Sequence, residues 1–470
     1  MRHANLRAGM LWILFILFGA FQGANAQAPA ANDSTVLTLE QCIRMALRNN
    51  YQIRNSYYMK KSADYDVLKS YQGILPTITV TAGKGRIENG PSEYLSNEPV
   101  GIDNEGNVIY EQRTRKLPST TRNSNSAGLS ISQTLFDGGI WWNQIRKSKA
   151  DAYSSEYQYE SDRNSIILQV QQAYFDLIKQ TKLLEVYDLA VQRSRAQLDR
   201  AQSMYQLGAT ARLDVFRAKV NLGNDRINYL NQKNVVEEAR KKLNLLLGRD
   251  PLTPVAVKTE VHINRDLPEL DELIATAMKS QPLLKKEMMD LKARSLSVKM
   301  AKGLNFPRVS LYLNYDRFHE NAIKVFSDYD QNYQLRFGLN VSFNLFNGFS
   351  DYANIQKAEI GRKMAMEALE DYKRTLKSQI HQTYMKYKST LEMIKINKEN
   401  LEAAKEEYRL AQERYQIGAG TALDVRDSQV NLTRAEETLV STEYQAQLLL
   451  AQLDNQLGLT YAKVKEKIDR

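Results

Sequence analysis

The chain has 470 residues, of which 64 are Lys or Arg and 54 are Asp or Glu, so its formal net charge at pH 7 is +10. It contains only 10 prolines and 22 glycines, and its mean hydropathy is −0.50. This balance excludes a helical membrane protein and an intrinsically disordered chain, and the basic excess alone indicates only non-specific electrostatic attraction.

Residues 1–26 have the three parts of a removable export signal in the right order. Basic residues Arg2 and Arg7 precede an apolar run at 11–21 that is too short to span a bilayer, and Ala24-Asn25-Ala26 follows as a small-residue cleavage pattern. Loss of Arg2 and Arg7 lowers the charge from +10 to +8. We therefore expect an exported protein, cleaved after Ala26, that does not bind nucleic acid.

The first predicted helix covers about residues 37–72 and contains Cys42, the only cysteine. A single cysteine excludes an intramolecular disulfide and a structural cysteine-based metal site. Cys42 is also not at the cleavage point, so it is not the acylated first residue of a lipoprotein. The amphipathic pattern around it predicts a role in core packing.

Two predicted strands come next, at about 75–84 and 127–137, separated by a polar, turn-rich stretch that we expect to be a long loop. Apolar residues alternate with polar ones in both, as at Ile78 and Val80, which is typical of a strand with one apolar face. Such strands fit either a half-buried soluble sheet or a transmembrane barrel.

A very long helix is predicted at about 139–207, and a returning helix at about 214–247 follows a turn at Gly208. Residues 140–207 lack both Gly and Pro, and apolar side chains recur at intervals of seven. These positions are Val170, Leu177, Leu184, Val191, Leu198 and Tyr205. A helix of this length is about 100 Å long, so it predicts a coiled-coil column rather than a compact domain.

The chain then repeats itself. Tyr205-Gln206-Leu207-Gly208-Ala209 recurs as Tyr415-Gln416-Ile417-Gly418-Ala419, an offset of 210 residues. Asp214-Val215 recurs as Asp424-Val425 at the same offset. Because this period is far too long for a solenoid, it indicates an internal duplication.

The duplication defines the expected domains. Residues 27–250 form the first repeat, 251–268 a proline-containing linker, 269–460 the second repeat and 461–470 a basic tail. The second repeat is predicted to contain strands at about 307–317 and 333–346 and helices at about 269–303, 349–417 and 424–457. The fold class is therefore mainly α with a small β part, built from a duplicated strand–strand–long helical hairpin unit.

Four amphipathic strands cannot close a membrane barrel, since open edges in hydrocarbon leave backbone groups unsatisfied and small barrels need about eight strands. Chains must pool their strands, and three chains supply twelve. The expected architecture is a trimeric twelve-strand transmembrane β-barrel continuous with an α-helical barrel.

The sequence resembles the TolC-type outer membrane efflux proteins over nearly the whole mature chain. The resemblance rests on the duplicated Tyr-x-x-Gly-x-x-x-x-x-Asp-Val, at Tyr205 to Val215 and Tyr415 to Val425, and on Phe-x-Gly at Phe136 and Phe346. It implies a homotrimeric channel-tunnel in outer membrane lipid with a long periplasmic extension. Small molecules or drugs would pass through it passively from an inner-membrane efflux transporter, by way of a periplasmic adaptor, to the exterior.

The resemblance also implies roles for residues at the periplasmic tip. Asp424 and Asp427 match carboxylates that ring the closed aperture, and Tyr415 and Asp214 match residues that link neighbouring hairpins. The turns where an adaptor would dock are Gly208, Ala209, Thr210, Ala211 and Arg212, and Gly418, Ala419, Gly420, Thr421 and Ala422.

One position departs from the family pattern, and a simpler role competes for the aspartates. Gly420 stands where well-known members carry an arginine of the lock, and either Arg212 or Arg426 is available to replace it. For Asp214 and Asp424, helix capping after a turn is the alternative role.

No constellation for catalysis, cofactor binding or a metal stands out in the sequence, so we expect a protein that is not an enzyme. Two other kinds of function stay open. The same conduit could serve type I protein secretion or heavy-metal efflux. Alternatively, the chain could be a soluble periplasmic coiled-coil scaffold that never enters the membrane.

Overall fold

The computed structural model describes residues 36–258, 267–327 and 329–469, so the export signal and its cleavage point lie outside the described part of the chain. The structure is mostly helical with a small sheet part, as predicted. The helices are α1 (Leu39–Asn49), α2 (Tyr51–Ser70), α3 (Ile140–Gln206), α4 (Arg212–Leu247), α5 (Leu270–Ser280), α6 (Pro282–Gly303), α7 (Ala322–Ser327), α8 (Ser350–Gln416), α9 (Ala422–Gln456) and α10 (Thr460–Asp469).

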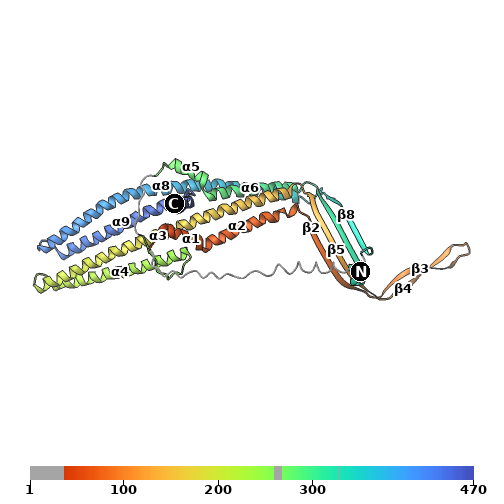
Figure 1. The fold of residues 1–470 in the computed structure, drawn as a ribbon, viewed down its shortest axis with the longest axis horizontal. Helices are drawn as coiled ribbons and strands as arrows, with labels where there is room; N and C mark the ends of the chain where they lie inside the picture. The colour runs from red at the N-terminus through yellow and green to blue at the C-terminus, as the bar shows by residue number, and fades with distance from the viewer. Residues whose placement is uncertain (1–35, 259–266, 328, 470) are drawn as a thin grey trace, which may run out of the picture.

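All strands but the short β1 and β6 lie at one end of the molecule, and the helices extend from that end in a long column (Figure 1). The strands are β1 (Val36–Leu37), β2 (Thr77–Asn89), β3 (Ser92–Ile102), β4 (Val108–Leu117), β5 (Thr120–Phe136), β6 (Ala256–Val257), β7 (Arg308–His319) and β8 (Tyr333–Ser342). β2, β5, β7 and β8 form one antiparallel sheet in that order, whereas β1 pairs with β6 and β3 with β4.

The two long helices form the spine of the column. α3 and α8 have 67 residues each. We call the half of each that is farther from the large sheet its lower half, and α4 and α9 run back along these lower halves as antiparallel partners. In the upper halves, α2 packs on α3, and α6 lies between α3 and α8. The first residues of the seven-residue series, Val170 and Leu177, are buried in this packing. No helix among the described residues is both long and apolar enough to cross a membrane.

A belt of packing surrounds the middle of the column, where α4 and α9 end and α2 and α6 begin. Its largest core includes Cys42, which is fully buried among side chains of α1, α3 and α4, so the predicted packing role is confirmed. Tyr174 of α3 donates to the carbonyl oxygen of Lys258 at 3.0 Å and thereby ties the short β1–β6 sheet to the column.

Two of the predicted helices are in fact broken at this belt. The helix expected at 37–72 stops at Asn50, which has an extended backbone, caps α2 and donates to the carbonyl oxygen of Leu246 at 3.0 Å. The helix expected at 269–303 breaks at Gln281, because Pro282 disfavours a helical conformation in the residue before it. The Gln281 amide donates to the carbonyl oxygen of Gln456 at 3.0 Å.

Four other features differ from the elements expected or were not foreseen. The tail at 461–470 is largely helical, since it belongs to α10, which buries Val464 in the belt core. The long loop between the first two strands contains the β3–β4 hairpin. The last strand ends at Ser342 rather than 346, and α7 follows β7 where no helix was predicted.

Candidate functional site at the hairpin tips

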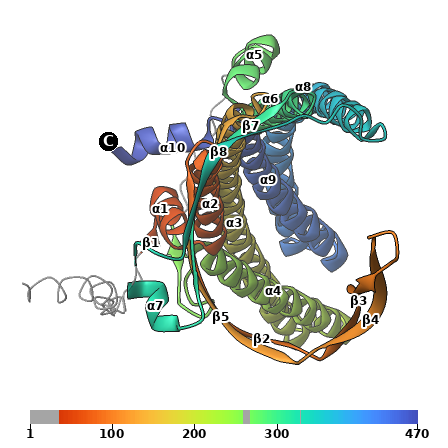
Figure 2. The ribbon, with the colours of Figure 1, turned by 90° about the vertical axis from the view of Figure 1, so that its right-hand side faces the viewer.

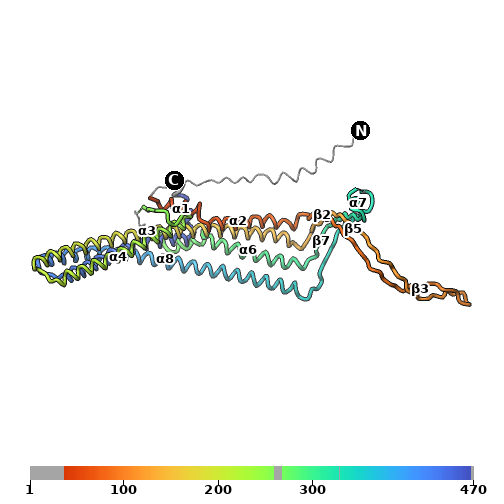
Figure 3. Tube along the Cα trace, turned by 90° about the horizontal axis from the view of Figure 1, so that it is seen from below, coloured from red at the N-terminus to blue at the C-terminus, as the bar shows by residue number. Residues whose placement is uncertain are grey.

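The two helical hairpins end side by side at the far end of the column from the sheet (Figure 3). Gly208 turns α3 into α4 and Gly418 turns α8 into α9, with φ angles of 74° and 75°. Glycine suits both positions because it adopts positive φ without the steric cost of a Cβ. The amides of Ala209 and Ala419 each donate to a carbonyl of the preceding helix at 2.8 Å. The two turns therefore share one backbone conformation.

The first tip has no side-chain cap on its second helix. Ala211 is the N-cap of α4 and makes no capping hydrogen bond. The Thr210 hydroxyl instead donates to the Asp214 carboxylate at 2.7 Å, and the Arg217 guanidinium lies 3.9 Å from the same carboxylate. Arg212 lies over the ring of Phe216, with 5.4 Å from guanidinium to ring centre. Capping therefore does not explain Asp214.

The second tip is capped. The Thr421 hydroxyl accepts from the Asp424 amide at 3.2 Å, and the Asp424 carboxylate accepts from the Thr421 amide at 2.9 Å. The hydrogen bond from the Thr421 amide to the Asp424 carboxylate is the main cause that lowers the pKa of Asp424, and the Thr421 side chain lowers it further. Capping is therefore one role of Asp424. Gly420 closes the turn tightly, because a Cβ there would lie 3.2 Å from Cβ of Arg414.

Tyr415 joins the two tips. Its side chain is only 7% exposed, whereas that of its counterpart Tyr205 is 45% exposed. Burial raises the pKa of Tyr415, and the negative charge of Asp214 raises it further, while Arg200 opposes the shift. The buried Tyr415 of the second hairpin therefore lies within electrostatic reach of Asp214 of the first.

The two aspartates predicted to line an aperture are not buried with Tyr415. Asp424 and Asp427 are both exposed and lie one turn apart on α9. Thr421 is exposed as well, and Ala422 is partly buried at the start of the helix. This side of α9 is therefore open for contacts outside the chain.

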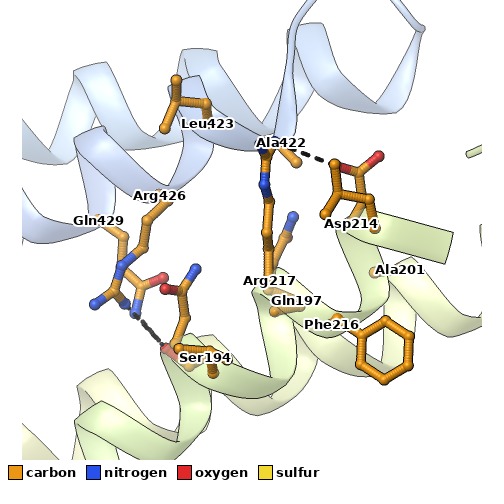
Figure 4. Close-up of a pocket in the computed structure, with 14 residues that line it drawn as sticks. Ser194, Gln197, Ala201, Asp214, Phe216, Arg217, Ala422, Leu423, Arg426 and Gln429 are labelled. Atoms are coloured by element: carbon orange, nitrogen blue, oxygen red, sulfur yellow. Dashed lines mark hydrogen bonds and ion pairs between the residues drawn. The ribbon is translucent and has the colours of Figure 1, made fainter. Parts of the chain in front are cut away.

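A buried ionic network above the tips was missed by sequence reasoning. Arg426 of α9 donates to both carboxylate oxygens of Asp225 on α4, at 2.8 and 3.2 Å. Ser194 of α3 donates to the same carboxylate, and the Gln429 amide donates to Ser194 at 2.8 Å (Figure 4). Asp225 is 6% exposed, so its charge is held by these partners and not by water.

A sequence signal for this network existed in α4. Ala218, Leu222 and Val236 form a buried stripe at helical spacing, and Asp225 and Gln232 occupy positions in the same stripe. A carboxylate in an apolar stripe predicts a buried partner. Arg193 of α3 and Glu436 of α9 make a second, largely buried ion pair between the hairpins, at 2.6 Å.

A cavity of about 560 Å³ lies between the tips and the buried network. α3, α4 and α9 each contribute to its walls, and Figure 4 shows Asp214 at one end of it and Arg426 towards the other. Leu213, Phe216 and Leu423 give it an apolar lining. Among the described residues, no group of three or more His, Cys, Asp or Glu side chains is placed to hold a metal ion.

Comparison with known proteins is consistent with this architecture. The family model described as outer membrane efflux protein matches residues 42–249 and 273–459. TolC of Salmonella enteritidis is 23% identical over 384 residues, 80% of this chain and 76% of its own. The toluene efflux pump outer membrane protein TtgC of Pseudomonas putida is 20% identical over 424 residues, 90% of this chain and 81% of its own.

Solved structures share the fold at low identity. The outer-membrane channel OprN superposes with a TM-score of 0.75 at 19% identity, covering 89% of each chain. The Campylobacter jejuni channel CmeC gives 0.74 at 19% identity, covering 91% of this chain and 88% of its own. Since the family model matches most of the sequence, the chain belongs to the outer membrane efflux protein family, a family of outer membrane channels and not of enzymes.

Proposed function

We propose that the chain, an internally duplicated unit, assembles as a homotrimer that conducts small molecules passively through the outer membrane. An inner-membrane efflux transporter and a periplasmic adaptor would supply the cargo at the hairpin tips. The observation that carries the proposal is the four-stranded sheet with an exposed apolar face, continuous with helices of 67 residues. The name of the relative TtgC favours small apolar compounds as cargo.

The sheet is incomplete in a single chain. Its outer strands β2 and β8 each have one unpaired edge, and exposed apolar side chains line one face of β8, with Phe337 73% exposed. Lipid satisfies an apolar face but not an unpaired backbone edge. Pairing β2 of one copy with β8 of the next removes every edge and gives twelve strands from three copies.

The helical column is incomplete in the same way. Along the lower half the helices lie in the order α4, α3, α9, α8, so α4 and α8 are its two borders. α4 exposes a stripe formed by Leu213, Phe216, Val220, Ile227 and Leu230. α8 exposes Ile396 and Leu410, fourteen residues apart, and its C-cap Ile417 is exposed seven residues further on. The two stripes run antiparallel, which suits coiled-coil packing of α4 on α8 of a neighbouring copy.

The tips would form the closed periplasmic end. Three copies each of Asp424 and Asp427 would make acidic rings that favour cations. Tyr415 beside Asp214, and Arg426 paired with Asp225, would hold the second hairpin against the first. Arg426 then supplies the ionic contact that Gly420 cannot make. The docking turns would be residues 208–212 and 418–422.

Planar bilayers test the conduit directly. We expect the purified trimer to give a low, cation-preferring conductance, and Asp424→Ala with Asp427→Ala to weaken that preference. Unchanged selectivity would contradict the proposal that these aspartates form acidic rings. Recovery of a monomer from the soluble periplasm would instead support a scaffold. The cargo can be identified from the transporter and adaptor that co-purify with the chain. A protein-exporting pump would indicate type I protein secretion, and a metal-exporting pump would indicate heavy-metal efflux.

A further inference from the structure

The β3–β4 hairpin continues the register of the β2–β5 ribbon, which stays the same as far as an irregularity between Pro99 and Gly101. Asn89 of β2 faces Thr120 of β5, and Ser92 of β3 faces Leu117 of β4. Counting inward from both pairs places Pro91 opposite Pro118. The two strand pairs are thus one long hairpin with a cross-strand pair of prolines inside it.

Opposed prolines weaken the ribbon at that point. Proline has no amide N–H, so neither residue can donate to a ladder. Residues 90–91 and 118–119 are accordingly outside the strands, and the ribbon bends there in Figure 1. Within the described part of the chain no third strand stiffens the ribbon here, because β7 ends at His319, opposite Asn125. The proline pair is therefore a hinge in a free two-stranded ribbon.

Beyond the hinge, residues 92–117 form a unit that we call the arm. Cross-strand ion pairs fix its register, from Lys116 to Glu93 at 3.0 Å and from Arg115 to Glu98 at 2.5 Å. Its turn is closed by Asp103, whose carboxylate accepts the amides of two following residues at 2.8 and 2.9 Å. The arm is held together by its own contacts, whereas the strand pairing is interrupted at residues 90–91 and 118–119. These two features favour motion of the arm as a single unit.

We propose that the arm is a hinged lid over the outer mouth of the channel. The proposal rests on the trimeric barrel proposed above. At about 3.3 Å per residue the 11 residues of β3 span about 36 Å. A barrel of twelve strands about 4.8 Å apart and tilted by about 40° is about 24 Å wide, so an arm reaches across it. Figure 2 shows the arm continuing the arc of β2 and β5, so the arm bends toward the concave side of the sheet.

Removal of the arm tests the lid. A variant in which an Asn-Gly turn replaces residues 90–119 joins Asn89 to Thr120, already paired, by a two-residue hairpin turn. We expect little change in its conductance, because the closed tips in series limit the flow, so the readout is access to the barrel from the outside. Polymers added on the external side should enter several-fold more readily. Equal polymer entry would overturn the lid.

Cross-linking tests the lid separately from the conduit. If no variant conducts, the proposed conduit function is contradicted, but the position of the arms can still be measured. Glu105→Cys places a thiol on the arm turn, and Ile323→Cys places one in α7, on the convex side of the sheet in Figure 2. Arms that meet over the mouth give disulfide-linked dimers of the Glu105 variant on oxidised cells, but not of the Ile323 control. Equal yields, or none from either, would contradict the proposal.

The hinge has its own test. The double substitution Pro91→Thr with Pro118→Thr restores both amide donors. It should stiffen the ribbon and keep the arm in the position seen in Figure 1, away from the mouth. The cross-linking yield of Glu105→Cys should then fall several-fold. An unchanged yield would show that the prolines are not the hinge.

Discussion

The two hairpin tips have the same backbone and different chemistry. Both turn through a glycine at φ near 75°, and both place an aspartate six residues later. In the second tip that aspartate, Asp424, completes a cap with Thr421. In the first tip the N-cap is Ala211, and Asp214 accepts from Thr210 and lies near Tyr415 instead. The residue that caps one helix in one tip is a contact between hairpins in the other.

The packing around each residue of the repeated motif, and not the motif itself, therefore determines what that residue does. Tyr205 and Tyr415 occupy equivalent positions, yet only Tyr415 is covered by the other hairpin. The network around Asp225 extends the same asymmetry, since its counterpart at the offset of 210 is Ala435, which has no carboxylate, and the arginine comes from α9 alone. Substitutions at equivalent positions of the two tips should therefore have unequal effects.

The largest effect is expected from Asp225→Ala. Removal of this carboxylate leaves Arg426 partly buried without its partner, which costs about 3 kcal/mol for a buried pair. Amide hydrogen exchange of α4 and α9 should show that loss in local opening free energy. The double exchange Asp225→Arg with Arg426→Asp should recover part of it. If the double exchange is no better than the single change, the ion pair is not what joins the hairpins.

A smaller difference is expected between the two tyrosines. Tyr415→Ala removes a buried ring and should destabilise the tips by about 3 kcal/mol, whereas Tyr205→Ala should cost well under half of that, because half of its side chain is already in water. Thermal unfolding of the two variants side by side checks this. Equal losses would mean that the tips are equivalent in the assembled protein.

The caps give the next effect in size. Thr421→Ala should cost about 1 kcal/mol, the usual value of an N-cap side chain. Ala211→Thr tests the other tip, because it offers α4 the cap that it lacks and should stabilise it by a similar amount. Exchange rates in the first turns of α4 and α9 report both. A loss from Ala211→Thr would show that the uncapped turn is needed as it stands.

The smallest expected effect is a loss of local stability at the second tip when the pH is lowered. The folded pKa of Asp424 is lowered, chiefly by the Thr421 amide, so its contribution to stability is present above the ordinary aspartate pKa of about 3.9 and is lost as pH falls through the folded value. The protection factors of amides in the first turn of α9, which correct for the intrinsic pH dependence of exchange, should therefore fall on acidification below about pH 4. Asp424→Asn should abolish that pH dependence, and its persistence would assign it to another group.

The sequence was enough to predict elements whose signal is local. The long helices and the turns at Gly208 and Gly418 lie where expected, and each alternating pattern is a strand, although β2, β5 and β8 differ from the predicted bounds. Breaks that depend on distant partners were not predictable, such as those at Asn50 and Gln281, whose side chains bond to carbonyl groups far along the chain. α10 belongs to the same class, since the Tyr461 amide donates to Asn164 of α3 at 2.9 Å.

The candidate site divides in the same way. The tip residues followed from a repeated motif, whereas Asp225 was identified only once α4 and α9 were side by side. A single carboxylate in an apolar stripe predicts that a partner exists, but it does not say which of the chain's many arginines supplies it. The hinge was hidden for another reason, because Pro91 and Pro118 are opposed only when the register is known.

The belt gives the column a mechanical property. α3 changes partners there, from α4 below to α2 and α6 above, so the lower half is a lever with its fulcrum at the belt core. The 36 residues of α4 make that lever about 54 Å long at 1.5 Å per residue. A tilt of about 5° at the fulcrum then displaces the tip by about 5 Å, roughly one turn of helix. Small rearrangements among belt side chains are thereby amplified into movements larger than any hydrogen bond at the tips can span.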